Sequence, residues 1–229
     1  MILTPSQAEA LRKKIQDGIN EVVAEANSAI NRLESLTSWI PIVGSWIKSG
    51  LEKFRNLVQE FVDKVAYYLT AFEVPVYMGQ YSQDWLNIAH QAGGVASDIS
   101  NMTQQYGSDE WGGIAGGAYK NGVSGQEPAV DAIQSRANSI SSACNSLEQV
   151  GWAFYIAVAA VIVGLILAAV GWETVVLAVA GVIAALVGLA TAAATWIFGV
   201  NGCANSFNQL LEPSDSLGVG DSWPVATSS

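Results

Sequence analysis

Positive charge is scarce in this chain of 229 residues, and none of it lies in the last third. Lys and Arg together number 10 against 20 Asp and Glu, which gives a formal net charge of -10. No Lys or Arg follows Arg136. Nucleic acids call for clusters of basic side chains, so they are not expected as partners. The C-terminal part also lacks the polybasic patch that grips anionic lipid.

Side chains suited to catalysis or metal binding are few. The chain has one histidine, His90, and two cysteines, Cys144 and Cys203. With no second histidine, the two cysteines cannot make a structural zinc site. No strand pattern precedes a glycine-rich phosphate loop. We therefore expect no enzyme, no cofactor and no metal, and we expect His90 to lie on a helix surface or in a helix seam.

An ordinary secretory signal is also missing, because the N-terminus has no basic run followed by an apolar core. If the protein leaves the cell, we expect another route. The low charged content, 13%, and the 51% of hydrophobic residues are typical of a helical protein that seeks membranes.

Long apolar runs are what the chain has in excess, at residues 152–199. Two apolar arms flank a short break at 171–174, and Glu173 in that break is the one charged side chain of the stretch. Each arm can cross a hydrocarbon core of about 30 Å, which takes about 20 helical residues. The pattern predicts an antiparallel helical hairpin that contacts a membrane. The alternative is a core hairpin of a soluble helical protein, which would also be apolar all round.

Tryptophans and small residues mark this hairpin further. Trp152 and Trp196 lie at its open end and Trp172 at its tip, where interfacial aromatic residues are found on membrane helices. Small residues recur every four positions, which lets helix backbones approach closely in lipid. Such stripes could seal the hairpin or join copies of it. They comprise Ala160, Gly164 and Ala168 on the first arm and Ala180, Ala184, Gly188 and Ala192 on the second, with Gly181 beside them.

The first 72 residues predict an amphipathic helical hairpin. Thr4, Pro5 and Gln7 form a capping box with proline at the first helical position. Apolar residues then follow the helical period to about Leu36. A turn around Pro41 precedes a second helix, expected over residues 45–72. The loop residues 39–43 are expected either to pack under the loop or to form a docking patch.

A second helical hairpin is predicted over residues 77–150. Its first helix, 77–106, carries an apolar seam whose spacing alternates between three and four residues, which is a heptad pattern. Ser124 to Glu127 form a capping box for the returning helix, which carries a matching seam and continues into the apolar hairpin. The seams are Met78, Tyr81, Trp85, Ile88, Ala92, Val95, Ile99, Met102 and Tyr106, and Val130, Ile133, Ala137, Ile140, Cys144 and Leu147.

The link between these two helices contains a tryptophan flanked by glycines. Trp111 and Gly113 are followed by the small residues Ala115 and Ala118 and by Tyr119. Glycines let the chain reverse, the indole can fill the gap between helix ends, and small residues let the returning helix lie close. We expect Trp111 to be largely buried at this turn.

This stretch resembles the WXG family of the ESX, or type VII, secretion systems of Gram-positive bacteria. The likeness covers about residues 77–150. It implies a helical hairpin with Trp111 and Gly113 at its turn and a helical or secretion-system protein as partner. The Tyr-x-x-x-Asp/Glu export motif of that family does not follow Trp111, and the one instance, Tyr106 to Glu110, precedes it. A co-secreted partner could supply the signal.

The predicted architecture is an all-α, elongated bundle of two antiparallel helical hairpins plus a transmembrane-like apolar hairpin. Its divisions are 1–73, 74–150, 151–212 and a disordered tail at 213–229. The first two hairpins could pair into a four-helix bundle. The favoured function is a type VII-linked secreted protein that inserts its hairpin into membranes as a pore-forming or membrane-depolarising effector, alone or as a homo-oligomer. The alternatives are an adaptor or chaperone for a toxin or secretion component, and a resident membrane-anchored protein.

The two cysteines predict a disulfide. Cys144 lies about as far before the hairpin tip as Cys203 lies after it, and both helices rise about 1.5 Å per residue. The two should therefore lie at nearly the same level on neighbouring helices, where a bridge is geometrically allowed. A bridge would staple the open end of the hairpin and would indicate an oxidising compartment. The alternative is two unconnected buried thiols.

Overall fold

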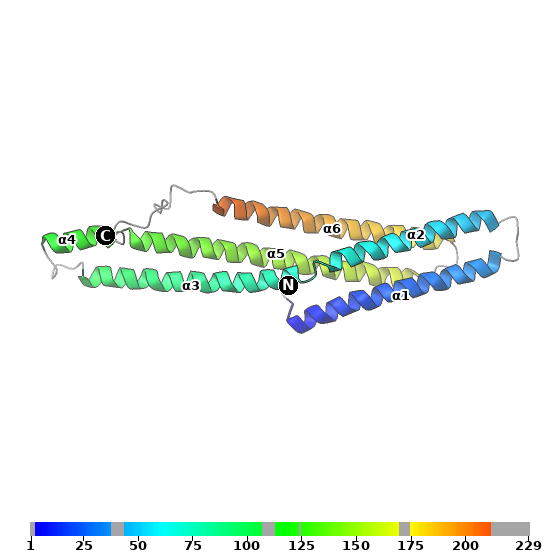
Figure 1. The fold of residues 1–229 in the computed structure, drawn as a ribbon, viewed down its shortest axis with the longest axis horizontal. Coiled ribbons are helices and arrows are strands. Elements are labelled where there is room, and N and C mark those ends of the chain that lie inside the picture. The colour runs from blue at the N-terminus through cyan, green and yellow to red at the C-terminus, as the bar shows by residue number, and fades with distance from the viewer. Residues whose placement is uncertain (1–2, 38–43, 107–112, 124, 170–174, 212–229) are drawn as a thin grey trace. The chain divides into compact units, whose positions relative to one another are not determined.

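The chain is all-α in a computed structural model that describes residues 3–37, 44–106, 113–123, 125–169 and 175–211 (Figure 1). The loop residues 39–43 and the tail 213–229 lie outside this description. Within it there are six helices, and all but one are long. They are α1 (Pro5–Thr37), α2 (Gly44–Leu69), α3 (Val74–Tyr106), α4 (Ile114–Val123), α5 (Gln126–Ala169) and α6 (Val175–Leu211).

The start of α1 confirms the predicted capping box. The backbone N–H of Thr4 donates to Gln7 Oε1 over 2.9 Å, and the Gln7 N–H donates to Thr4 Oγ1 over 3.3 Å. Each side chain thus satisfies a backbone donor that the first helical turn leaves unpaired. Pro5 opens the helix, as its fixed φ and missing N–H allow.

The helices divide between two compact units. Unit 1 comprises Met1–Val76 and Glu148–Val200, and unit 2 comprises Tyr77–Leu147 and Asn201–Ser229. The divisions predicted from the sequence differ from these units. The apolar hairpin shares a unit with the N-terminal helices, and the last turns of α6 share one with α3 and the first half of α5.

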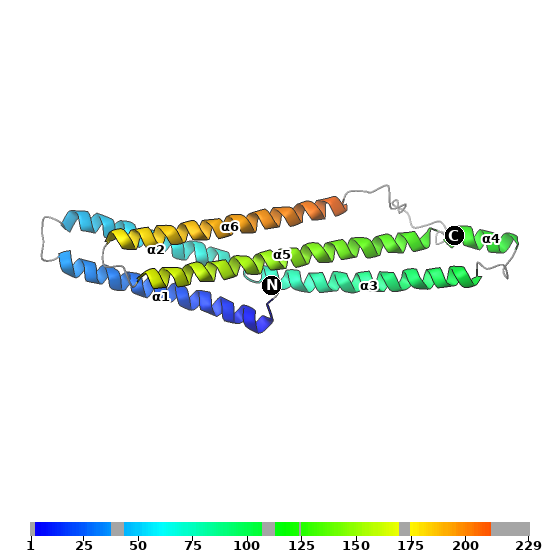
Figure 2. The ribbon, with the colours of Figure 1, turned by 180° about the vertical axis from the view of Figure 1, so that it is seen from behind.

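Unit 1 is built around a single apolar core to which four helices contribute. Figures 1 and 2 show α1 and α2 running alongside the apolar parts of α5 and α6. Ile15 and Val22 of α1 and Phe54 and Phe61 of α2 are fully buried there. Residues of the apolar hairpin complete the same core: Trp152, Tyr155, Val158, Ile162, Leu165, Ala178, Val182 and Leu189.

This core corrects one expectation about pairing. The sequence predicted that the N-terminal hairpin could pair with the 77–150 hairpin, but its buried face packs on the apolar hairpin. The physical reason is the amount of apolar surface that each possible partner of the N-terminal hairpin can bury. The arms of the apolar hairpin present aliphatic side chains all round, whereas a heptad seam presents a narrow stripe, and burial free energy scales with apolar area.

The antiparallel arrangement of the apolar hairpin is confirmed by contacts between its arms. A Cβ added to Gly188 would lie 3.1 Å from Val161 Cγ2, and one added to Gly199 would meet Val150 Cγ1. Moving from Val161 back to Val150 on α5 thus corresponds to moving forward by the same number of residues on α6. The two glycines let the arms approach more closely than larger side chains would allow.

Unit 2 pairs α3 with the first half of α5. Ser82 and Ser141 join the two helices in a buried reciprocal clamp. The Ser82 hydroxyl donates to the Ser141 carbonyl over 3.0 Å, and the Ser141 hydroxyl donates to the Ser82 carbonyl over 2.8 Å. Gly93 lies so close to Gln134 that an added Cβ would meet its Nε2 at 2.6 Å. Buried hydroxyls with satisfied bonds favour one register of the pair.

The predicted heptad seam of α3 does not coincide with the buried face of the helix, which shares only Ala92 with it among the described residues. Ser82, Ala89, Ala92 and Ala96 are buried, because their small side chains allow α5 to approach closely. Tyr81, Ile88, Val95 and Met102, which recur every seven residues, are exposed. We call these four residues the α3 stripe.

Candidate functional site

Two of the described helices, α5 and α6, contain stretches long and apolar enough to cross a membrane. Length and composition alone do not separate a membrane helix from the core helix of a soluble protein, which is apolar for the same reason. The distinction lies in which faces of the helices the rest of the chain buries.

One face of the apolar hairpin is buried by α1 and α2. Phe72, just after α2, stacks edge-on against Trp152 with ring centroids 5.6 Å apart and contacts Tyr155 at 4.6 Å. The Tyr155 hydroxyl donates to the Tyr68 carbonyl over 2.8 Å. Gly18 of α1 lies directly against Ile162. This aromatic contact at the end of α2 has no periodic signal in the sequence, so it was not predicted.

The other face of the apolar hairpin is exposed within unit 1. On α5 the large apolar side chains Ile156, Val163 and Leu167 are exposed, with Ala160 between them. On α6 the exposed large apolar side chains are Val176, Leu177, Ile183, Val187, Ile197 and Phe198, and Ala180, Ala190 and Ala194 are exposed along the same helix. No charged side chain belongs to either set. We call these two exposed sets together the apolar face; exposed apolar side chains in such number indicate a site for lipid or a partner.

Some of the predicted small residues lie where α5 and α6 meet, whereas Ala160 and Ala180 are exposed. Gly164 and Gly181 line a shallow apolar groove of about 250 Å³ between the arms, together with Val161, Leu165, Ala184 and Ala185. Gly188 lies against Val161. Gly188 therefore lets the two arms approach closely, which was one of the two roles predicted for these residues, whereas a Cβ added to Gly164 would meet no atom within 4 Å.

The predicted interfacial tryptophans are core residues in this folded form. Trp152 is 1% exposed, and its indole Nε1–H donates to Glu148 Oε1 over 3.3 Å. Trp196 is half-buried, packs on Phe154, and lies against Gly151. Trp152 packs on Phe72, and Trp196 packs on Phe154, which belongs to the same group of aromatic side chains. Trp172 and Glu173 lie outside the described residues.

Of the Trp-x-Gly turn, the structure describes Gly113 and the residues that follow. Gly113 has a φ of 93°, a conformation that side-chain-bearing residues rarely adopt, so the turn requires glycine at this position. Ala115, Ala118 and Tyr119 lie on α4, a short helix that was not predicted from the sequence. Ala115 and Ala118 are exposed and Tyr119 is half-buried. Trp111 lies outside the described residues, so its burial stays a prediction.

The predicted disulfide is wrong. Cys144 and Cys203 are both buried free thiols. Burial raises the pKa of each thiol, and the nearness of Cys203 raises the pKa of Cys144 further. The two residues therefore lie near one another, but a common level along two helices does not make their Cβ atoms point at each other, as a bridge requires. Without a disulfide, the two cysteines do not indicate an oxidising compartment.

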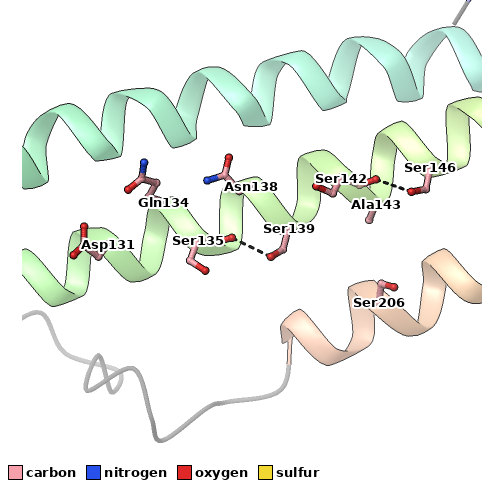
Figure 3. A pocket seen from close by; sticks show the side chains of 9 residues that line it. All are labelled: Asp131, Gln134, Ser135, Asn138, Ser139, Ser142, Ala143, Ser146 and Ser206. Carbon is pink, nitrogen blue, oxygen red and sulfur yellow. Dashed lines mark hydrogen bonds between the residues drawn. The ribbon is translucent and has the colours of Figure 1, made fainter.

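Unit 2 also carries an open polar groove of about 730 Å³ along α5 (Figure 3). It is lined by Asp131, Gln134, Ser135, Asn138, Ser139, Ser142, Ala143, Ser146 and Ser206. The hydroxyls of Ser139, Ser146 and Ser206 donate to carbonyls four residues earlier in their own helices. Because these bonds are local, the groove presents a mildly polar helix surface rather than converging groups.

Chemical groups for catalysis do not gather anywhere in the described part of the chain. No three His, Cys, Asp or Glu side chains there lie close enough together to hold a metal ion. His90 is exposed on α3. Comparison with known proteins gives no further guidance, since no family model, curated protein or solved structure matches this chain.

Proposed function

We propose that this chain is a membrane-active helical protein whose apolar hairpin enters lipid bilayers, as a pore-forming or membrane-depolarising effector. The observation that carries the proposal is the exposed apolar face. Two helices of membrane-spanning length each leave a stripe of large aliphatic and aromatic side chains uncovered. In water this surface is costly, and transfer into hydrocarbon would remove the cost.

Secretion through a type VII route is part of the proposal and rests on the Trp111-to-Gly113 turn. The positive φ of Gly113 supports the view that this motif makes a real chain reversal between helices. A homo-oligomer, or a helical or secretion-system protein as partner, belongs to the same proposal.

The test is dye release from liposomes by the full chain purified without detergent, compared with Val187→Arg. Val187 is 60% exposed and lies midway along the apolar arm of α6. An arginine there meets water in the soluble form, but at the centre of a membrane helix it costs about 2.5–3.5 kcal/mol. We expect the variant to fold normally and to release little dye.

Tyr67→Arg is the matched control, because Tyr67 is 71% exposed on α2, away from the hairpin arms. It should release dye at the parental rate. Parental release by Val187→Arg would remove the hairpin as the membrane element. If the parent chain stays in solution only when detergent is present, the result would favour a resident membrane-anchored protein instead.

A second candidate function, a helical adaptor or chaperone, is favoured by the α3 stripe. Four apolar side chains at heptad spacing, with Asp84 and Asp98 beside them, are suited to an amphipathic partner helix. Val95→Asp should abolish a complex with such a partner while leaving dye release unchanged. Loss of dye release together with the complex would tie the two functions to one assembly.

A further inference from the structure

Resting on the proposed function, we infer that the N-terminal hairpin, α1 with α2, is an intramolecular cover that must leave the apolar hairpin before that hairpin can enter lipid. The evidence is that the two hairpins share one core, in which the faces of α1 and α2 are buried against α5 and α6. The cover hides one face of the apolar hairpin and leaves the apolar face to make the first contact with the bilayer.

The outer surface of the cover cannot follow the apolar hairpin into hydrocarbon. A further groove lies along the contact between α1 and α5, and its α5 side is lined by Ile162, Val163 and Ile166. On the α1 side the rim carries Lys13, Lys14, Asp17 and Glu21, all exposed. Each such charge costs about 2.5–3.5 kcal/mol at the centre of a membrane helix on insertion scales, so entry of the four helices together is excluded.

The apolar contacts that hold the cover are of a kind that lipid can replace, while the hydrogen bond from Tyr155 to the Tyr68 carbonyl has to break when the cover leaves. Phe72 packs on Trp152 and Tyr155, and Gly18 packs on Ile162. Acyl chains are as apolar as these side chains, so the buried face of the apolar hairpin exchanges one apolar environment for another. The released α1 and α2 would keep their own apolar faces, which suit amphipathic helices lying in the membrane interface.

The contact between Gly18 and Ile162 allows a designed disulfide that would hold the cover on the apolar hairpin. A Cβ added to Gly18 would lie 3.8 Å from the Cβ of Ile162, and disulfides have a mean Cβ–Cβ separation of about 3.8 Å. The experiment uses the full chain with Gly18→Cys and Ile162→Cys in a Cys144→Ala, Cys203→Ala background. Dye release from zwitterionic liposomes is measured for the oxidised and the reduced protein.

We expect the oxidised protein to release dye at the background rate and the reduced protein to recover release. Equal release by both redox forms would overturn the cover while leaving the proposed function intact. Failure of the parent chain itself to release dye would overturn the proposed function, and the cover with it.

A second substitution at the same contact keeps the inference falsifiable if the cysteine variant is inactive in both redox forms. In Gly18→Ala the new Cβ would lie 2.5 Å from Ile162 Cγ2, so either the Ile162 side chain or α1 must shift, and the packing of α1 on α5 is disturbed. We expect release several-fold faster than that of the parent. Ile162→Leu, which lacks the β-branch, should return Gly18→Ala to the parental rate. Unchanged or slower release by Gly18→Ala would overturn the cover.

Discussion

Single residues with special backbone or burial decide where this chain bends and which thiols react. Gly113 and Gly117 offer a matched comparison. Gly113 has a φ of 93°, whereas Gly117 lies inside α4 with open space around its Cα. Forcing a side chain into a left-handed conformation costs about 1–2 kcal/mol, while replacing an open helical glycine by alanine gains about 0.5–1 kcal/mol.

Gly113→Ala should therefore lower the free energy of unfolding and Gly117→Ala should raise it, as measured by denaturant titration of helical circular dichroism. Effects of the same sign would show that the Trp-x-Gly turn does not depend on glycine geometry.

Cys144 and Cys203 should both titrate as free thiols. Because they are buried and burial raises the pKa of both, the folded protein should react slowly with a thiol reagent at neutral pH. Unfolding without a reductant should expose two thiols per chain at once. Finding none under those conditions would restore the disulfide that the structure lacks.

At the scale of helices, the structure separates two kinds of position within the apolar hairpin. Leu186 is half-buried and packs against the core, whereas the neighbouring Val187 is exposed. Leu186→Arg should lose both stability and dye release, because it places a charge in the core of the soluble form as well as in lipid. Val187→Arg should lose dye release alone. Thermal unfolding and dye release of the two variants, measured in parallel, test this difference.

The sequence was sufficient to predict the long helices, but it did not predict the short helix α4 or which helices pack together. Thr4, Pro5 and Gln7 specified the start of α1 because capping is a local interaction. The 3.6-residue period gave the long helices for the same reason. The choice between Ser82 and Tyr81 as the buried side of α3 depends on how closely α5 approaches, which is a property of two segments far apart in sequence. The same holds for the packing of Phe72 on Trp152.

The candidate site was predicted in part. Residues 152–199 were singled out from composition alone, and their antiparallel arrangement follows from the short break between the arms. The face of the apolar hairpin that α1 and α2 cover could not be predicted. Both arms are apolar all round, so no amphipathic pattern distinguishes a buried side from an exposed one. The prediction of the disulfide was wrong for a similar reason. Counting residues gives the height of each cysteine along its helix, but it does not give the direction in which its side chain points.

For the molecule as a whole, net charge should govern which membranes it meets. The formal charge of -10 and the absence of Lys and Arg after Arg136 predict repulsion from anionic lipid. Dye release should be several-fold slower from liposomes rich in anionic lipid than from zwitterionic ones. Added salt should narrow the difference, because the Debye length falls to about 8 Å at physiological ionic strength. Faster release from anionic liposomes would indicate a local basic contact instead.

The depth that α6 reaches in a bilayer tests the central claim most directly. In a chain with Cys144→Ala and Cys203→Ala, Val187→Cys carries an environment-sensitive fluorophore, and Tyr67→Cys carries the same probe as a control. Quenchers are attached to lipids either near the headgroup or deep in the acyl chains. The account predicts that the probe at position 187 shifts to the blue and is quenched most strongly by the deep label. The probe at position 67 should respond weakly and only to the shallow one. A probe at position 187 that binds with the liposomes yet stays in water would contradict insertion of the apolar hairpin.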